Sequence, residues 1–199
     1  MRNVPLNRLA GILIANLLLF LGLSGCASTA PGVVDRLDWT TGVTITLVQT
    51  PLMLYRETPA QAAYARDYAQ LGPIQVNRSG TYQYYLWVGS WATMQRSSVS
   101  EHRDGFESIV IFSDGEPLVL ELSGWTPAAI GASQSTYLKP VASSTDAYYQ
   151  VTVDQIRIIA QARDIRLHTT GSSPKEYELW DDQALARNHL AEFLRKTQM

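Results

Sequence analysis

Alternation of apolar and polar residues predicts that much of the chain is extended. Residues 43–49, VTITLVQ, place valine, isoleucine and leucine at alternate positions, which is typical of a strand with one buried face. Residues 81–91 are bulky at both odd and even positions, which is typical of a strand covered on both faces. We expect strands at both places, and a continuation of the first over residues 52–55 after a bend at Pro51.

A turn signal predicts a hairpin near the middle of the chain. Asp114-Gly115 lies between the apolar runs of residues 106–112 and 118–122, and Asp-Gly in that setting favours a two-residue turn. The residues from 124 to 146 are rich in Gly, Pro, Ser and Thr and predict a long loop. Further short elements are expected as one helical turn at residues 127–130 and strands at 148–151, 165–169 and 176–180.

Three segments have the start and stop signals of helices. Over residues 58–71 a threonine suits the N-cap and apolar side chains recur at three- and four-residue spacings, until Gly72 and Pro73 end the pattern. Residues 152–162 begin with a Thr-x-x-Gln capping box. A last helix is expected after Asp182, and its apolar face consists of Ala186, Leu190, Phe193 and Leu194.

These elements together predict the fold class. Hairpins combined with a few separate helices are typical of an α+β fold. The sequence lacks the regular strand-helix-strand alternation of a parallel sheet. We therefore expect a mainly antiparallel sheet with about three helices packed on it.

The first 25 residues have the pattern of a secretory signal peptide. Arg2 and Arg8 make the start positive, an apolar run follows over residues 9–23, and small residues come next. A transmembrane helix needs about 20 predominantly apolar residues. The run is shorter than that, so cleavage is expected rather than a permanent span.

The end of this segment is more specific than an ordinary cleavage site. Leu23-Ser24-Gly25-Cys26 resembles the lipobox of bacterial lipoproteins, Leu-[Ala/Ser]-[Gly/Ala]-Cys, at all four positions. The resemblance implies cleavage before Cys26, the single cysteine of the chain, with diacylglycerol on its sulfur and an amino group that can take a third acyl chain. Each buried methylene contributes about 0.8 kcal/mol, so two or three chains on one residue would hold the protein at the membrane. The alternative is an ordinary secreted protein with a cysteine near its cleavage site.

The resemblance also implies an organisation and a location. We expect a lipoprotein signal peptide over residues 1–25, the lipidated cysteine and a short tether over residues 26–36, and a single α+β domain over residues 37–199. In the lipoprotein family an aspartate after the cysteine is associated with retention in the inner membrane. Ala27 stands there instead, which implies lipid anchoring in the outer membrane on its periplasmic face, or at the cell surface if the source has a single membrane.

Composition excludes several classes of function. The chain has 16 basic and 18 acidic residues, and loss of Arg2 and Arg8 with the signal peptide leaves a net charge of −4. A mildly acidic domain lacks the basic surface that nucleic-acid binding requires. With Cys26 as the lone cysteine, no intramolecular disulfide or thiolate metal site is expected, and the sequence contains no cofactor fingerprint.

Short motifs with a catalytic appearance are each expected to be loops. Ser172-Ser-Pro-Lys175 spells S-x-x-K, the acylating motif of penicillin-binding proteins, but it precedes an extended run rather than opening a helix. Residues 131–135 approach G-x-S-x-G and lack its last glycine. His102 lies among acids and serines, a crowding typical of a solvated turn. We expect no catalytic residue and no enzyme activity.

The remaining titratable residues do not form a recognisable set. His168 and His189 have no metal-ligand spacing to each other, and no metal or other cofactor is expected. Glu176 and Glu178 alternate with apolar residues on a strand, so their carboxylates are expected to meet water rather than to face each other across a cleft.

Aromatic residues supply the candidate binding site. Tyr85, Trp87, Trp91 and Trp125 can bind a glycan or an extended peptide if their ring faces are exposed. The alternative is that they form the core, since aromatic side chains bury large areas. The sequence leaves both possibilities open.

The most consistent function is therefore non-catalytic. We expect a lipid-anchored envelope protein, held at the membrane through Cys26, that binds or stabilises another envelope component, with an envelope protein or peptidoglycan as a possible partner. One alternative is a peptidoglycan- or glycan-binding module that uses exposed tryptophans. Another is an envelope hydrolase that uses His102 with a serine or an acid.

Overall fold

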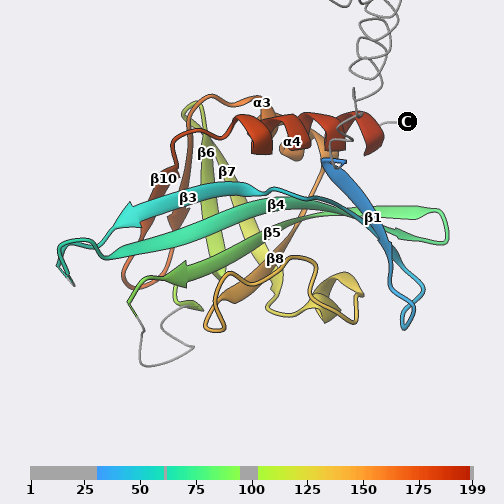
Figure 1. The fold of residues 1–199 in the computed structure, drawn as a ribbon, viewed down its shortest axis with the longest axis horizontal. Coiled ribbons are helices and arrows are strands. Elements are labelled where there is room, and N and C mark those ends of the chain that lie inside the picture. The colour runs from blue at the N-terminus through green and yellow to red at the C-terminus, as the bar shows by residue number, and fades with distance from the viewer. Residues whose placement is uncertain (1–30, 61, 95–102, 198–199) are drawn as a thin grey trace, which may run out of the picture. The chain divides into compact units, whose positions relative to one another are not determined.

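A computed structural model describes residues 31–60, 62–94 and 103–197 of the chain (Figure 1). The expected signal peptide, the lipobox with Cys26, and His102 lie outside the described residues. Within the described part the first strand begins at Val33. Residues 33–36, which were expected to belong to the tether, therefore belong to the folded domain.

Eight antiparallel strands close into a barrel. In order around the barrel they are β3 (Leu52–Glu57), β4 (Arg66–Arg78), β5 (Thr81–Ala92), β8 (Thr145–Val151), β7 (Glu116–Gly124), β6 (Ser108–Ser113), β9 (Ile165–Thr169) and β10 (Glu176–Leu179), which pairs with β3 again. The expected antiparallel sheet is confirmed. The hairpin of β6 and β7 turns at Asp114-Gly115, as predicted, and both residues have positive φ angles.

Two further strands extend the barrel wall to one side. β1 (Val33–Leu37) pairs with β2 (Thr44–Val48), and β2 pairs with the second half of β4. The first half of the same β4 edge pairs with β3. β2 and β3 are thus consecutive pieces along one edge of β4, separated by a bend at Pro51, as the sequence predicted.

The helix expected over residues 58–71 is wrong. β4 begins at Arg66 and is paired with β5 over twelve residue pairs. The spacing of Tyr68 and Leu71 fits a helix, but pairing along both edges of the segment gives the extended chain far more hydrogen bonds than an isolated helical turn would have. Tertiary pairing has overridden the local signal.

Pro73 lies in the middle of β4, a position that a paired strand usually excludes because proline has no backbone N–H. Thr93 N donates to Arg66 O, so even-numbered residues of β4 bond to β5 and Pro73 faces the opposite edge. On that edge β3 pairing ends at Leu71 and β2 pairing begins at Ile74. The missing N–H therefore falls in the gap between two strands, where no partner loses a donor.

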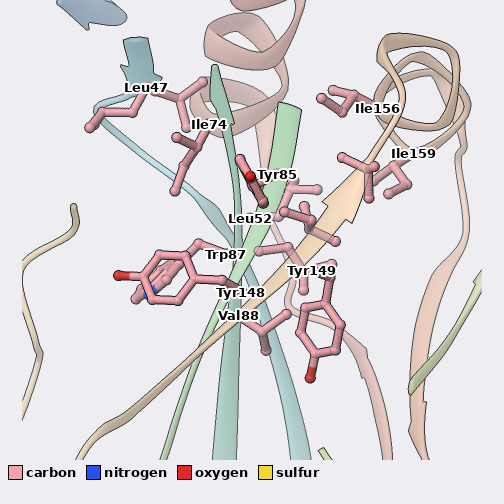
Figure 2. Close-up of a cluster of buried hydrophobic side chains, with 14 of the residues drawn as sticks. Leu47, Leu52, Ile74, Tyr85, Trp87, Val88, Tyr148, Tyr149, Ile156 and Ile159 are labelled. Atoms are coloured by element: carbon pink, nitrogen blue, oxygen red, sulfur yellow. The ribbon is translucent and has the colours of Figure 1, made fainter. Parts of the chain in front are cut away.

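Strand alternation divides the apolar residues into two cores. Residues of one parity fill the barrel interior, as Val88 and Tyr149 do, and residues of the other parity face outward beneath the loop of residues 125–144, as Trp87 and Tyr148 do (Figure 2). All four side chains are essentially inaccessible to solvent. Residues 85–90 of the strand over residues 81–92 are buried on both faces, as the sequence predicted, whereas residues 81–83 are exposed.

Two α-helices cover one end of the barrel (Figure 1). α3 (Val153–Gln161) has the predicted capping box, in which Thr152 Oγ1 accepts from Gln155 N and Gln155 Oε1 accepts from Thr152 N. η1 (Pro127–Ile130) is a single 3₁₀ turn. Strands thus outnumber helices among the described residues, and the fold is mainly β with helices at one end. No helix of the described ranges is long and apolar enough to cross a membrane.

The C-terminal helix fastens the start of β1. α4 (Ala184–Thr197) begins two residues after Asp182, the expected cap, and buries the predicted apolar face. Gly32 N donates to Glu192 Oε2 at 3.2 Å, and Lys196 Nζ lies 2.8 Å from Asp35 Oδ2. The His189 ring lies so close to Gly32 that a Cβ there would come within 2.2 Å of it. Only glycine allows this approach.

Asp38 ties the β1–β2 turn to the long loop. Its carboxylate accepts from the backbone N–H groups of Thr40 and Thr41 within the turn and from both the N–H and the hydroxyl of Ser133. Hydrogen bonds from Ser133, followed by those from the turn, lower the pKa of Asp38 to about 2. The charged form is thus the one that the folded chain stabilises.

Asp38→Asn should destabilise the domain near pH 5 and have a much smaller effect near pH 2. The folded-state pKa of about 2 lies below the ordinary 3.8, so the charge stabilises the fold above about pH 4, and this contribution is lost as the pH falls toward 2. Urea midpoints of the two proteins should converge over that window. Asp181→Asn, which removes an exposed carboxylate after β10, is the control. A difference that stays constant across the window would contradict the assignment.

Candidate functional site

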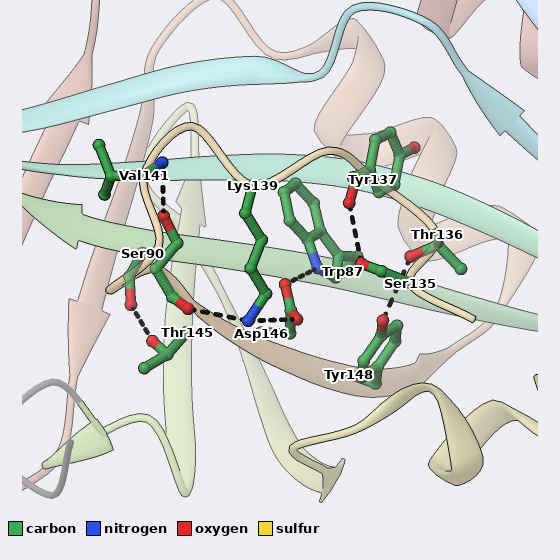
Figure 3. A network of polar contacts seen from close by, with 11 residues as sticks. Trp87, Ser90, Ser135, Thr136, Tyr137, Lys139, Val141, Thr145, Asp146 and Tyr148 are labelled. Carbon is green, nitrogen blue, oxygen red and sulfur yellow. Dashed lines mark hydrogen bonds and ion pairs between the residues drawn. The ribbon is translucent and has the colours of Figure 1, made fainter. Parts of the chain in front are cut away.

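Trp87 and Tyr85 belong to the outer core rather than to a binding surface. Trp87 is fully buried, its indole N–H donates to Asp146 Oδ1 at 3.0 Å, and its ring stacks on Tyr137 at a centroid distance of 4.4 Å (Figure 3). Tyr85 is 6 % exposed. Neither ring has a face free for a ligand, so the predicted binding role does not hold for these two residues. Trp87 is covered by the loop of residues 125–144, whose Tyr137 ring stacks on it.

Polar contacts hold that loop in place. Lys139 Nζ lies 3.2 Å from Asp146 Oδ2 and donates to Ser144 O at 2.9 Å (Figure 3). The Tyr137 hydroxyl donates to Pro73 O at 3.0 Å. Burial raises the pKa of Tyr137 well above its ordinary value. The ring of Tyr137 also lies against Gly72, where a Cβ would come within 2.5 Å of ring atoms.

Trp125 is half-buried at the end of β7 and packs against the core. The Arg103 guanidinium lies 4.9 Å from the centroid of its ring, which is a cation–π contact. One face of Trp125 is thus engaged within the chain. Its predicted role in binding stays a prediction.

Trp91 lies in a row of aromatic rings on the outside of the barrel. Tyr55 of β3 is directly opposite Tyr68 of β4, and Tyr68 is directly opposite Trp91 of β5. Tyr68 stacks on Trp91 at 5.3 Å, and Trp180, just after β10, lies 5.0 Å from Tyr55 and 5.9 Å from Tyr68 between ring centroids. We refer to Tyr55, Tyr68, Trp91 and Trp180 as the aromatic strip. All four side chains are half-buried.

The face on which the strip lies follows from strand alternation. Leu54, Ala69 and Ser90 adjoin the strip residues in sequence and are buried in the interior, so their neighbours point outward. Arg66 covers part of the strip: its guanidinium lies 5.4 Å from the centroids of both Tyr55 and Trp180. The same group forms an ion pair with Glu57 at 3.0 Å.

A cleft opens beside the strip because β3 and β10 separate. Their register comprises only Tyr55 opposite Glu178 and Leu54 opposite Leu179. The cleft has a volume of about 450 Å³ and is lined by Tyr55, Arg56, Glu57, Glu176 and Glu178. We refer to it as the β3–β10 cleft. Its volume lies within the roughly 300–1,000 Å³ of ordinary small-molecule sites.

The base of the cleft is an ion pair that belongs to the barrel interior. Arg56 Nε lies 2.8 Å from Asp67 Oδ2, with side-chain exposures of 25 % and 3 %. The Arg56 guanidinium also lies 6.0 Å from the centroid of the buried Tyr177 ring. Arg56 is therefore held from inside the barrel while part of its guanidinium is open to the cleft.

Each carboxylate of the rim is already positioned by a neighbour. The neighbouring Glu178 carboxylate is the main cause that raises the pKa of Tyr55, so the phenol keeps its proton. Glu176 lies 3.2 Å from His168 Nε2 and 3.6 Å from Arg166. Both Glu176 and Glu178 are exposed, as their sequence predicted.

The serines singled out in the sequence are engaged in loop contacts. The Ser133 hydroxyl donates to Asp38, and the Ser135 hydroxyl donates to Tyr137 O. Ser172 lies in the turn between β9 and β10, where its hydroxyl is 3.4 Å from Asp104. The helix that would bring Lys175 beside Ser172 in an acylating site is not formed.

Lys175 and the histidines are placed by structural contacts. Lys175 is buried, and its N–H donates to Thr169 Oγ1 at 2.9 Å while Nζ donates to Asp104 O at 3.4 Å. His168 contacts the Phe112 ring as well as Glu176. Over residues 31–60, 62–94 and 103–197, no three His, Cys, Asp or Glu side chains gather in a way that could hold a metal ion.

Comparison of the chain with protein-family models, with curated proteins and with solved structures gave no match. The functional conclusion therefore depends on the geometry of the aromatic strip and the β3–β10 cleft.

Gly72→Ala should destabilise the domain by about 1–3 kcal/mol, because the added methyl displaces the Tyr137 ring from a well-packed core. Urea unfolding followed by tryptophan fluorescence measures the change. In a Tyr137→Ala background the same substitution should cost much less, because the ring that it strikes is gone. An equal cost in both backgrounds would show that the contact between Gly72 and Tyr137 is not what requires glycine.

Arg56→Met should destabilise the domain by about 3 kcal/mol, because it removes the ion pair between Arg56 and the buried Asp67 carboxylate. Asp67→Asn should cost less, since Arg56 is partly open to water through the cleft and Asn still accepts a hydrogen bond. Urea midpoints at neutral pH give both values. The reverse order of the two effects would contradict the placement of Asp67 as the more buried member of the pair.

Proposed function

We propose that this chain is a lipid-anchored cell-envelope protein that works by binding another envelope component, and that the aromatic strip is its binding surface. The observation that carries the proposal is the register Tyr55–Tyr68–Trp91 on the outer wall of the barrel, extended by Trp180. Rings of this kind provide large contact areas with few rotatable bonds, and they are enriched where proteins bind partners.

The proposed anchor is the lipid on Cys26, supported by the match of residues 23–26 to the lipobox. Six residues lie between Cys26 and Val33, where β1 begins, so seven residue-to-residue steps join them. At about 3.3–3.6 Å for each extended residue, they reach at most roughly 25 Å. We propose the periplasmic face of the outer membrane as the location, or the cell surface if the source has a single membrane. The binding surface would then act close to the membrane.

Binding rather than catalysis is supported by what the polar side chains do. Ser133, Ser135 and Lys175 make contacts that fix loops. Trp87 and Tyr148 are buried under the long loop, and Tyr137 of that loop is buried against Trp87. The strip, by contrast, brings four large side chains together that remain partly open on a wall of paired strands. A rigid wall keeps the entropic cost of binding low.

Crosslinking in cells, followed by recovery of the full-length lipidated protein from gently solubilised membranes, should yield a specific partner. Tyr68→Ala and Trp91→Ala should each reduce its recovery about 30-fold, the effect of losing a contact of about 2 kcal/mol at a binding centre. Tyr82→Ala is the matched control, because Tyr82 is 54 % exposed and lies outside the strip. The recovered material is analysed for protein and for amino sugars.

Two further variants complete this test. Cys26→Ala should lose both metabolic labelling with palmitate and the partner. Urea midpoints of the strip variants establish that they fold. Full recovery of the partner with folded Tyr68→Ala and Trp91→Ala would overturn the strip as the binding surface, and palmitate labelling of Cys26→Ala would overturn the anchor.

A further inference from the structure

We infer that the envelope component is a glycan, and that a saccharide chain binds across the β3–β10 cleft and the aromatic strip. The inference rests on the proposed function, since it assigns a ligand class to the same surface. It starts from the side chain that the two features share: the ring of Tyr55 belongs to the strip, and Tyr55 also lines the cleft.

The cleft offers hydrogen-bond donors and acceptors side by side. Arg56 only donates, while Glu57, Glu176 and Glu178 accept when charged, and all four line the same 450 Å³ space. A sugar hydroxyl donates one hydrogen bond and accepts others. Neighbouring hydroxyls of one sugar ring can therefore bond to a carboxylate and to the guanidinium together.

Charge balance distinguishes this ligand from ionic ones. A phosphate or a carboxylate ligand would meet three glutamates at the rim, and a cationic ligand would meet Arg56 at the base. Each rim charge is also held near a partner of opposite sign or a hydroxyl: Glu57 by Arg66, Glu176 by Arg166, and Glu178 by the Tyr55 hydroxyl. A neutral polyhydroxyl ligand is repelled neither by the glutamates nor by Arg56.

The aromatic strip supplies the apolar half of saccharide recognition. A pyranose ring has a face of C–H groups that packs on an aromatic ring, whose face carries partial negative charge. The strip crosses three neighbouring strands, which lie about 4.7–4.9 Å apart. Cleft and strip together are longer than a single sugar ring, so an oligosaccharide fits the surface better than a monosaccharide.

The contacts already present preorganise the surface. Arg56 is held by Asp67 from inside the barrel, and Arg66 is held over Tyr55 and Trp180. These groups need little reordering when a ligand binds, which lowers the entropic cost of association. The interior ion pair with Asp67 thus fixes the position of Arg56, which would contact the ligand.

Titration of the full-length lipidated protein in detergent with chitotetraose, a neutral oligosaccharide, tests the inference. Binding is measured by calorimetry and by tryptophan fluorescence, to which Trp91 and Trp180 contribute. Tyr55→Phe and Glu178→Gln should each weaken binding about tenfold, the loss expected for one hydrogen bond to a charged group. Tyr68→Ala should weaken it at least as much. Tyr82→Phe, outside the strip, should leave it unchanged.

The outcomes separate this inference from the proposed function. If chitotetraose does not bind, or if it binds to folded Glu178→Gln and Tyr55→Phe as well as to the wild type, the glycan inference is overturned. Recovery of a protein partner that depends on Tyr68 and Trp91 would then leave the proposed function standing. Loss of saccharide binding in these variants, together with amino sugars in the crosslinked material, supports both.

Discussion

Pairing of β4 along both of its edges is the constraint on which the rest of the structure depends. One edge carries β5 for almost its whole length, and the other carries β3 and then β2. Through these pairings β4 belongs both to the closed barrel and to the extension that ends in β1. The register places Tyr68 between two other rings on the outside and Asp67 beside Arg56 on the inside. Tyr68 of the strip and Asp67 at the base of the cleft therefore lie on opposite faces of the same strand.

Closure of the barrel creates an interior that differs between its two ends. The helices α3 and α4 cover one end, where apolar residues such as Ile156 and Phe193 are buried. Polar and charged groups lie toward the other end, where Arg56 pairs with Asp67 and Ser90 contacts Thr145 at 2.7 Å. Buried charges are tolerated because they are paired. The pairing also explains how a cationic group comes to stand at the base of a surface cleft.

The sequence predicted those elements whose signals are local. The turn at Asp114-Gly115 and the capping box at Thr152 depend on residues next to each other, and both are confirmed. The segment around Tyr68 was misassigned because its apolar residues fit two periods at once, 3.6 and 2. Pairing with β3 and β5 stabilises the extended form, and this pairing depends on residues outside the segment. Pro73 supported the wrong assignment, because a proline is rarely found inside a paired strand. It is accommodated in β4 only because it faces the gap between β3 and β2.

The candidate site was predictable only in part for the same reason. Trp91 was a candidate because it is an aromatic residue on a predicted strand. Trp87, four residues earlier on the same face, met the same criteria. The loop of residues 125–144 covers one and leaves the other beside Tyr68. Tyr55 and Trp180 were missed because only the barrel order brings β10 next to β3. Burial by a distant loop and adjacency across a closed sheet are both properties of the whole fold.

The attachment of β1 to α4 has a mechanical consequence. Any force on the N-terminal end of the domain enters at Gly32, whose N–H bonds to Glu192, and passes to Asp35 with its contact to Lys196. Among the described strands, β1 pairs only with β2, and it lies outside the ring of eight. Under tension the first structure to yield is thus β1 with its helix contacts. The ring of eight strands that carries the cleft and the strip keeps its own pairing when β1 detaches.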